Sequence, residues 1–478
     1  MHERPVMRTL PRPPTSFTPV PPPALLAPLA LACLVGLAGC PDRTVAALTP
    51  EQVGEISKEI PVTTEIDLLF VIDDSGSTRD KQTVFAANFP RFVQALDAFE
   101  GGRPNLHIGV VSTTVDLGVS NIGGCPHPAP ADDGLLHNKP SGSCLAPNGR
   151  YIVDVAEPGG GRRTNYTGTL EGTLSCIAQI GSTGCGFEAP LEAMKRALDG
   201  SRPENAGFLR KGAFLVVVFL VDEDDASIED PGFFDEVPMS DFAAQPLQAY
   251  RCDRPISPTD PGTYANCRPR TDSALVDPAH YYEVLSSIVP PGRTVVALIG
   301  GNPESAIAIG PLVISGREQP LALMPSCSAT INGNPAIARP ALRLADFTAR
   351  YGARGLFRTV CQPDYSQALA DIGQLVATSV SPCLEGGVVT ADLDPEAPGT
   401  QLECNVSDVV VETEHETQIP RCAMQGPEQP VAAGERPCWW VTQNPVACAA
   451  TPTQLELHVE RTSPPAPGTN VRVRCATR

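Results

Sequence analysis

The sequence has little positive charge for its length of 478 residues. Its 35 lysines and arginines stand against 54 aspartates and glutamates, which gives a formal net charge of −19. A surface with this charge repels phosphate groups, so the composition argues against a nucleic-acid-binding protein. The same surface suits cation binding and solubility.

The sequence also lacks several motifs of well-known active sites. It has no CxxC pair and no HxxxH pair, which argues against zinc. It has no GxSxG motif, and no histidine lies in an obvious partner motif for a nucleophile. We therefore expect that the protein is not an enzyme. Two alternatives stay open: a metal-dependent hydrolase that uses Ser75 or the ion, and a structural envelope protein with a non-productive site.

A long membrane-spanning apolar run is missing as well. The N-terminal stretch "ALLAPLALACLVGLAGC", Ala24 to Cys40, follows a basic region and is too short and too proline-flanked for a convincing spanning helix. We interpret residues 1–39 as a signal peptide. The alternatives at its end are a lipoprotein signal and an ordinary signal peptide that happens to contain a cysteine.

The end of this stretch, Leu37-Ala38-Gly39-Cys40, resembles the lipobox of bacterial lipoproteins. In that family the cysteine is lipidated on its thiol and becomes the mature N-terminus. The resemblance implies a lipid anchor on Cys40 in the bacterial cell envelope, at the outer membrane or cell surface in preference to the inner membrane.

Cysteine is abundant, with 16 in the chain. Setting aside Cys33 in the signal and Cys40 leaves an even number outside the cytoplasm, so we expect disulfides. Close spacing suggests four pairs, and two further cysteines are candidates: Cys125/Cys144, Cys176/Cys185, Cys252/Cys267 and Cys438/Cys448, with Cys327 and Cys361 in addition.

The chain divides into four parts by composition and periodicity. After Cys40, polar residues up to 64 form an expected tether. Residues 65–380 alternate apolar runs with helical patterns, which predicts an α/β domain with a doubly wound, mostly parallel Rossmann-like sheet. Insertions interrupt it near 223–278 and 301–337. Residues 381–478 hold cysteines and alternating runs, which predicts a small disulfide-rich all-β domain.

Two apolar runs of the central part end in acids. "IDLLFVID" ends at Asp73 and reads as a strand buried on both faces, and "AFLVVVFLVD" ends at Asp222. Beyond the first run, apolar residues from Phe85 to Phe99 recur on one helix face, which Pro90 should kink or split. Ligands of parallel sheets bind at the carboxyl ends of strands, so we expect a site near the two aspartates.

The motif after the first strand has the form DxSxS. Asp73, Ser75 and Ser77 are alternate residues that a tight loop can point at one spot, whereas Asp74 points the other way. One carboxylate and two hydroxyls are hard ligands suited to Mg²⁺, Mn²⁺ or Ca²⁺. The alternative is that Asp73 caps the following helix, a role equally open to Ser75, Ser77 and Thr78.

The stretch "DLLFVIDDSGS" resembles the first strand and metal-ion-dependent adhesion site of von Willebrand factor type A domains. The resemblance covers about residues 65–380. It implies that a divalent ion is held by Asp73, Ser75 and Ser77, with Thr183 and Asp222 binding directly or through water. It also implies an open position for a carboxylate from a protein or glycan partner.

The sequence departs from that family at two places. Ser182 precedes Thr183 where the family often has glycine, and three more acids follow Asp222, namely Glu223-Asp224-Asp225. These acids would start a solvated loop, which we favour, or would raise the local affinity for cations or bind a second ion.

Overall fold

The computed structural model describes most of residues 54–477, all within one compact unit that spans Pro50–Arg478. The residues not described are 1–53, 62–64, 100–101, 117–131, 140–143, 158, 229–245, 258, 272–274, 305, 315–316, 450, 464, 467 and 478. The predicted signal peptide, Cys40 and the first part of the predicted tether therefore lie outside the described residues.

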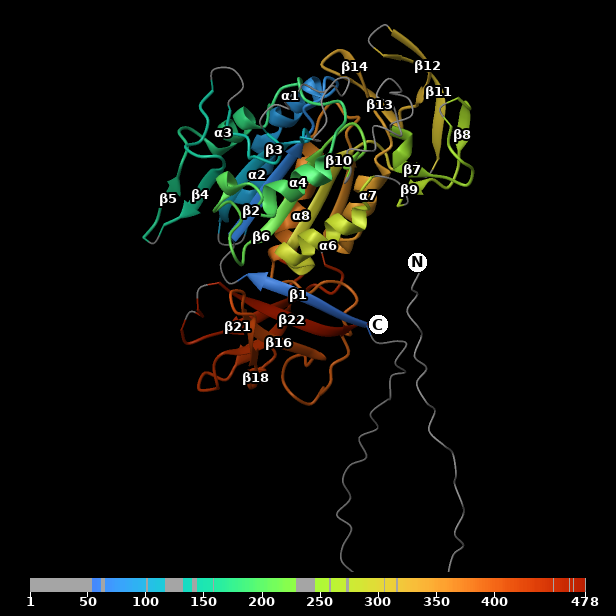
Figure 1. The fold of residues 1–478 in the computed structure, drawn as a ribbon. Coiled ribbons are helices and arrows are strands. Elements are labelled where there is room, and N and C mark those ends of the chain that lie inside the picture. The colour runs from blue at the N-terminus through green and yellow to red at the C-terminus, as the bar shows by residue number, and fades with distance from the viewer. Residues whose placement is uncertain are drawn as a thin grey trace, which may run out of the picture. The chain divides into compact units, whose positions relative to one another are not determined.

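The largest sheet has seven strands, which Figure 1 shows at the centre of the described residues. In spatial order they are β15 (Gly355–Thr359), β10 (Thr294–Gly300), β6 (Phe214–Leu220), β2 (Glu65–Ile72), β3 (Asn105–Ser112), β4 (Ile152–Ala156) and β5 (Arg162–Thr164). The pairs from β15 to β3 are parallel, whereas β4 and β5 are joined antiparallel.

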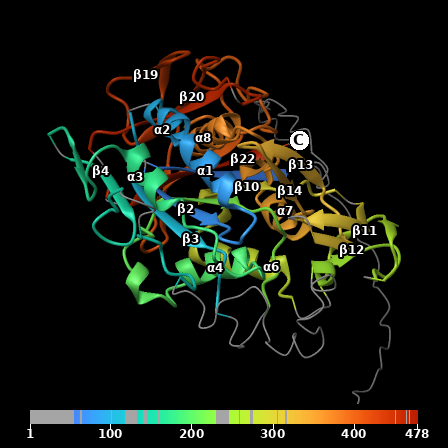
Figure 2. The same cartoon turned by 90° about the horizontal axis from the view of Figure 1, so that it is seen from above.

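Helices contribute to two hydrophobic clusters, one for each face of this sheet. The helices are α1 (Arg79–Ala87), α2 (Phe89–Asp97), α3 (Leu170–Ile177), α4 (Pro190–Leu198), α6 (Pro278–Ile288), α7 (Leu342–Ala349) and α8 (Ser366–Val380). Side chains of α1, α2, α3 and α8 form one cluster, and those of α4, α6 and α7 form the other. Figure 2 shows these two groups of helices on opposite sides of the sheet. None of the helices in the described part of the chain is long and apolar enough to cross a membrane.

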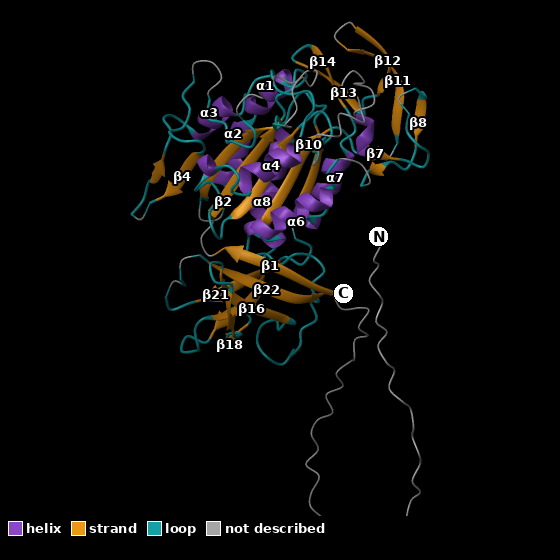
Figure 3. Ribbon diagram, viewed as in Figure 1, coloured by secondary structure: helices purple, strands orange, loops and turns teal. Residues whose placement is uncertain are grey.

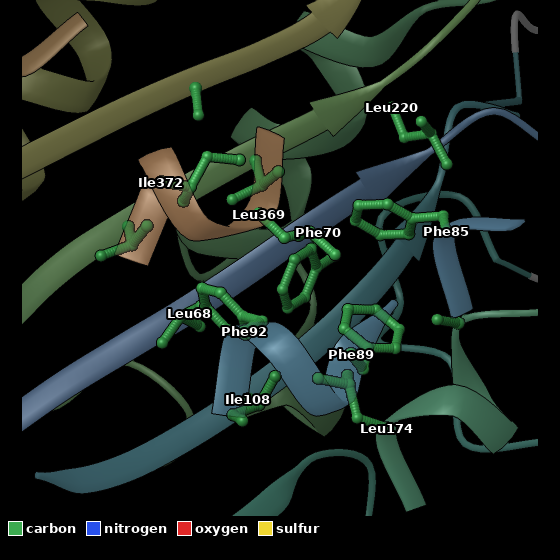
Figure 4. Close-up of a cluster of buried hydrophobic side chains, with 14 of the residues drawn as sticks. Leu68, Phe70, Phe85, Phe89, Phe92, Ile108, Leu174, Leu220, Leu369 and Ile372 are labelled. Atoms are coloured by element: carbon green, nitrogen blue, oxygen red, sulfur yellow. The ribbon is translucent and has the colours of Figure 1, made fainter. Parts of the chain in front are cut away.

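Strand β2 is the centre of both clusters. Its residues Leu68 to Ile72 are fully buried, and neighbours along it alternate between the clusters because side chains of a strand alternate faces. The Phe70 ring packs edge-to-face against three phenylalanines from α1 and α2 (Figure 4). The prediction of a strand buried on both faces is confirmed.

The helical pattern after β2 is split as Pro90 predicted. Helix α1 ends at Ala87, and α2 begins at Phe89 with the proline in its first turn. A proline has no backbone N–H, so it is tolerated in a first turn but breaks a helix interior. The last helix, α8, then packs close to α2, since a Cβ on Gly373 would lie 2.5 Å from that of Ala95.

The remaining strands form small sheets. They are β1 (Gly54–Pro61), β22 (Thr469–Thr477), β16 (Cys404–Val410) and β17 (His415–Ile419) in one sheet; β12 (Arg317–Leu323), β11 (Ile307–Ile314) and β8 (Gly262–Tyr264) in another; and the pairs β13 (Cys327–Ile331) with β14 (Asn334–Ala338), β18 (Met424–Gly426) with β19 (Gln429–Pro430), β20 (Cys438–Gln443) with β21 (Leu455–Glu460), and β7 (Tyr250–Arg251) with β9 (Arg268–Pro269).

The predicted fold class is therefore wrong for this chain. Strand makes up 33% and helix 22%, and the strands are spread over many small sheets tied by disulfides. Apart from an isolated parallel bridge between Arg421 and Trp439, parallel pairing in the described residues involves five strands of one sheet. A doubly wound, Rossmann-like α/β fold therefore does not describe the molecule. The pattern after residue 220 misled the prediction, because the expected loop-like insertions contain β7, β8, β9 and β11–β14.

Strand β1 is a second difference from expectation. Its residues fall in the predicted tether, yet β1 pairs antiparallel along its whole length with β22 near the end of the chain (Figure 3). The ammonium of Lys58 is buried and donates hydrogen bonds to the carbonyls of Thr378 and Cys383. Burial lowers the pKa of Lys58 to about 8. The segment is thus part of the folded unit.

Disulfides join many of the candidate cysteines. Within the described residues the pairs are Cys144–Cys176, Cys252–Cys267, Cys327–Cys361, Cys383–Cys448, Cys404–Cys475 and Cys422–Cys438. The predicted pair Cys252/Cys267 is confirmed. Cys185 is disulfide-bonded too, and Cys125 lies outside the described residues.

The other three predicted pairs are wrong. Cys144 and Cys176 each had a closer neighbour in sequence, but they bond to one another across 32 residues. Cys438 and Cys448 bond to other cysteines instead of to each other. A disulfide needs Cα atoms that lie within a few ångströms of each other, usually about 4.4–6.8 Å, and the fold sets that distance more than the spacing along the chain does.

The packing of Phe70 leads to a test of the core. We expect Phe70→Ala to lower the free energy of unfolding by about 3–5 kcal/mol, because it removes a fully buried ring and leaves a cavity. Leu393→Ala is the control, since that side chain is 60% exposed and should change stability by less than about 0.5 kcal/mol. Denaturant unfolding measures both, and equal effects would contradict the central place of β2.

Candidate functional site

The carboxyl ends of β2 and β6 form one edge of the largest sheet. The two strands are parallel neighbours with Ile72 opposite Leu220, and the backbone N–H of Asp73 donates to the carbonyl of Leu220 at 2.9 Å. Asp73 follows β2 directly, and Asp222 comes two residues after the end of β6. The register thus brings together two aspartates that are far apart in sequence.

A tight loop from Asp73 to Thr78 connects β2 to α1. The backbone N–H of Ser75 donates to Asp73 Oδ1 at 2.7 Å, and the Thr78 hydroxyl donates to the carbonyls of Asp73 and Ser75. Thr78 is the residue at the N-cap position of α1. The alternative in which Asp73 caps this helix is therefore wrong, and its carboxylate orders the loop instead.

The side chains of four predicted ligands are linked. The hydroxyls of Ser75 and Ser77 lie 3.1 Å apart, and Ser77 donates to Asp222 Oδ1 at 3.1 Å. Together with the Ser75–Asp73 bond, these contacts join Asp73, Ser75, Ser77 and Asp222 into one network. Lys81, in the first turn of α1, donates to Asp222 Oδ2 at 2.6 Å.

One oxygen of this network is left over. Asp73 Oδ2 is buried and has no hydrogen-bond partner among the described residues. Burial raises the pKa of Asp73 well above its usual range, and the charge of Asp222 raises it further. An orphaned carboxylate oxygen beside a second carboxylate and two hydroxyls is the arrangement that a hard divalent cation would complete.

Further acids lie close to this network. Burial and the charges of Glu223, Asp73 and Asp222 raise the pKa of Glu188, whose side chain is 4% exposed. Among the described residues, four mutually interacting carboxyl groups are accompanied by two cationic side chains; they are Asp73, Asp222, Glu188 and Glu223, with Lys81 and Arg339.

Hydroxyls are essential to any metal site here. In the described part of the chain no three side chains of His, Cys, Asp or Glu are grouped so that they could hold a metal ion. The donor set that fits a cation is therefore the mixed one of carboxylates and serine hydroxyls, which favours Mg²⁺, Mn²⁺ or Ca²⁺ over softer metals.

Thr183 is brought near this edge but is not bonded into the network. Its side chain is exposed. The loop that carries it is fixed by its neighbours, because the N–H of Gly184 donates to the carbonyl of Asp74 and Arg79 donates to Ser182. Asp74 accepts a hydrogen bond from Thr114 at 2.8 Å, and burial raises its pKa to about 6. Its carboxylate is thus turned away from the network.

Lys81 and Glu188 are the residues that sequence reasoning missed. Lys81 lies beyond the DxSxS motif with no recognisable spacing, and Glu188 lies in the approach to α4 between two apolar residues. Both are almost fully buried. A charged residue between two apolar neighbours was a sequence signal for Glu188, whereas Lys81 lies between Asp80 and Gln82 and gave no such signal.

The three acids after Asp222 do not start a solvated loop, so the favoured interpretation was wrong. Asp224 accepts from the backbone N–H groups of Arg343 and Leu344 at the start of α7, and burial raises its pKa to about 7. Asp225 accepts from the N–H of Leu191 in α4 and pairs with the Arg343 side chain at 2.9 Å. Asp224 and Asp225 thus anchor two helix N-termini, where negative charge is favourable, whereas Glu223 pairs with Arg339.

Comparison with known proteins gives only distant similarity. No family model and no curated protein matches the chain. Similar solved structures include the pilus adhesin SpaC from Lactobacillus rhamnosus GG in an open conformation (11% identity, TM-score 0.31, covering 90% of this chain and 42% of that one). Others are proximal thread matrix protein 1 from the mussel byssus (11%, 0.27, 68% and 48%) and the pilus adhesin RrgA from Streptococcus pneumoniae (9%, 0.19, 89% and 57%).

The chain spans about half the length of these solved structures. At such identities and TM-scores they assign neither a fold nor a function to it, so the site is interpreted from its own residues.

The buried pair Arg343–Asp225 can be tested against a surface pair of the same region. We expect Arg343→Met to destabilise the protein by about 3–5 kcal/mol, because it leaves a fully buried carboxylate without its cation. Arg350→Met removes the exposed pair with Asp346 and should cost no more than about 1 kcal/mol. If denaturant unfolding shows the same decrease in the free energy of unfolding for both variants, the Arg343 guanidinium does not stabilise the Asp225 carboxylate.

Proposed function

We propose that the chain is a cell-envelope protein, lipid-anchored through Cys40, that binds a protein or glycan partner through a divalent metal ion. The single observation that carries this proposal is the orphaned Asp73 Oδ2 in a network that already contains Ser75, Ser77 and Asp222. The protein is a binding protein in this proposal and not an enzyme.

The chemistry of the residues supports a hard cation. Asp73, Ser75 and Ser77 would hold it, with Asp222 binding directly or through water, and Thr183 would be added from its exposed loop. A bound ion would stabilise the ionised form of Asp73, whose pKa is otherwise raised by burial. Mg²⁺ or Mn²⁺, or Ca²⁺, fits such oxygen donors.

The small number of charged protein ligands indicates which chemical group the partner would donate to the ion. The network offers two carboxylates, and one of them already pairs with Lys81. A divalent ion held by so little negative charge gains strongly from an anionic ligand. A carboxylate on a protein side chain or an acidic sugar supplies that ligand, which makes partner binding dependent on metal.

Metal binding predicts a stability change. We expect saturating Mn²⁺ to stabilise the wild-type chain, by about 2.7 kcal/mol when the free ion is a hundredfold above its Kd. Asp73→Asn keeps the side-chain volume but removes the charge and should abolish the shift. Thermal unfolding with and without Mn²⁺ measures both.

The control for this measurement is Glu412→Gln, which removes a carboxylate that is 77% exposed. It should respond to Mn²⁺ as the wild type does. If Mn²⁺ leaves the unfolding temperature of the wild type unchanged, as it does for Asp73→Asn, the proposed metal binding is contradicted.

Partner capture gives a second test. Immobilised protein should retain a partner from the producing cells in Mg²⁺ or Mn²⁺, and a chelator should release it. Asp73→Asn should retain none under either condition, and Glu412→Gln should behave as wild type. Capture that survives the chelator would sink metal-dependent binding, and metal-dependent turnover of esters or phosphoesters would point to a hydrolase.

A further inference from the structure

Lys81 is an unusual residue for the edge of a cation site. It lies in the first turn of α1, its side chain is 2% exposed, and its ammonium donates to Asp222 Oδ2 at 2.6 Å and to the carbonyl of Ser77 at 3.1 Å. Lysine is almost never so buried unless it is paired. The chain has therefore placed its own positive charge where an external cation would also be attracted.

The contacts of Lys81 make the two aspartates of the network unequal. Asp222 has both oxygens engaged within the protein, Oδ1 by the Ser77 hydroxyl and Oδ2 by the ammonium. Asp73 has one oxygen bonded to the Ser75 N–H and the other without a partner in the described residues. An incoming ion would thus meet a free oxygen on Asp73 and an occupied carboxylate on Asp222.

We propose that Lys81 is a built-in competitor for the metal ion, which weakens metal binding by occupying Asp222 and makes the bound ion depend on the partner's carboxylate. This inference rests on the proposed function, since it requires an ion at Asp73. The ammonium and the ion repel each other at short range, and the repulsion is screened little because the site is buried.

The consequence concerns what the site recognises. Glu223 is balanced by its ion pair with Arg339 at 3.0 Å. Of the bonded groups, Asp73 and Asp222 contribute two negative charges and Lys81 one positive charge, so a divalent ion leaves these three groups with an excess of one positive charge. A single carboxylate restores neutrality. The built-in cation therefore selects a monoanionic group and disfavours a neutral ligand such as water or a plain hydroxyl.

A purely structural role for Lys81 makes a different prediction. If the ion pair only held α1 against β6, its loss would lower stability and would leave metal affinity unchanged or weaker, because Asp222 would be less well placed. Competition predicts the opposite sign, a gain in metal affinity. The sign of the change separates the two roles.

The test is a titration of the full chain with Mn²⁺ alone, by calorimetry, in wild type, Lys81→Met and Lys81→Arg. Methionine keeps the length of the side chain without its charge, and we expect it to bind Mn²⁺ about tenfold more tightly or better. Arginine keeps the charge and should stay within about threefold of wild type. Lys211→Met is the matched control, since that lysine is 61% exposed.

Thermal unfolding with and without Mn²⁺ adds a second readout, because a purely structural role predicts no larger rise on Mn²⁺ addition for Lys81→Met than for wild type. Without metal, Lys81→Met should unfold at a lower temperature than wild type because Asp222 is left without its cation. With Mn²⁺ its unfolding temperature should rise by more than that of wild type. If Lys81→Met does not fold, Lys81→Gln takes its place, because an amide can still donate to Asp222 Oδ2 without a charge.

The outcomes divide as follows. Mn²⁺ binding that is tighter in Lys81→Met or Lys81→Gln than in wild type supports competition. If wild type itself binds no Mn²⁺, this result still supports competition, but it contradicts metal-dependent capture of a partner by the wild type. Unchanged or weaker binding by these variants, with normal binding by wild type, overturns the role of Lys81 and leaves the proposed function intact. No binding by any of them overturns both.

Discussion

The parallel register between β2 and β6 is the constraint on which the site depends. Because Ile72 lies opposite Leu220, the two strands end at the same level and deliver Asp73 and Asp222 to one edge. The register is fixed by burial, since every residue from Leu68 to Ile72 is fully buried and a shift by one residue would exchange the two faces of the strand. A well-packed strand thus positions two carboxylates that would otherwise repel each other.

Burial of so many acids forces the chain to satisfy them, and it does so unevenly. Asp224 and Asp225 are held by helix N-termini and Arg343, Glu223 by Arg339, and Asp222 by Lys81. Asp73 keeps one oxygen without a partner in the described residues. A buried carboxylate oxygen of this kind is costly, and it is the observation on which the proposed metal site rests.

Patterns that depend on neighbours in sequence predicted the structure well. The buried strand β2, the split between α1 and α2 at Pro90 and the local disulfide Cys252–Cys267 follow from apolar periodicity, the missing N–H of proline and short loop closure. Predictions failed where the structure depends on contacts between residues that are far apart in the sequence. Cys144–Cys176 needed the path of the intervening chain, and β1 needed its partner β22 from the far end. The fold class failed because small sheets carry much of the strand content.

The sequence by itself determined where a carboxylate and two hydroxyls follow a buried strand, because the motif from Asp73 to Ser77 is local. The tertiary structure alone decided that Ser77 donates to Asp222, that Lys81 pairs with Asp222 from 141 residues away, and that Glu188 is buried near them. The physical reason is electrostatic. The charge state of a buried carboxylate, and whether its oxygens have hydrogen-bond partners, depend on which groups surround it in space. Those groups can come from any distance along the sequence.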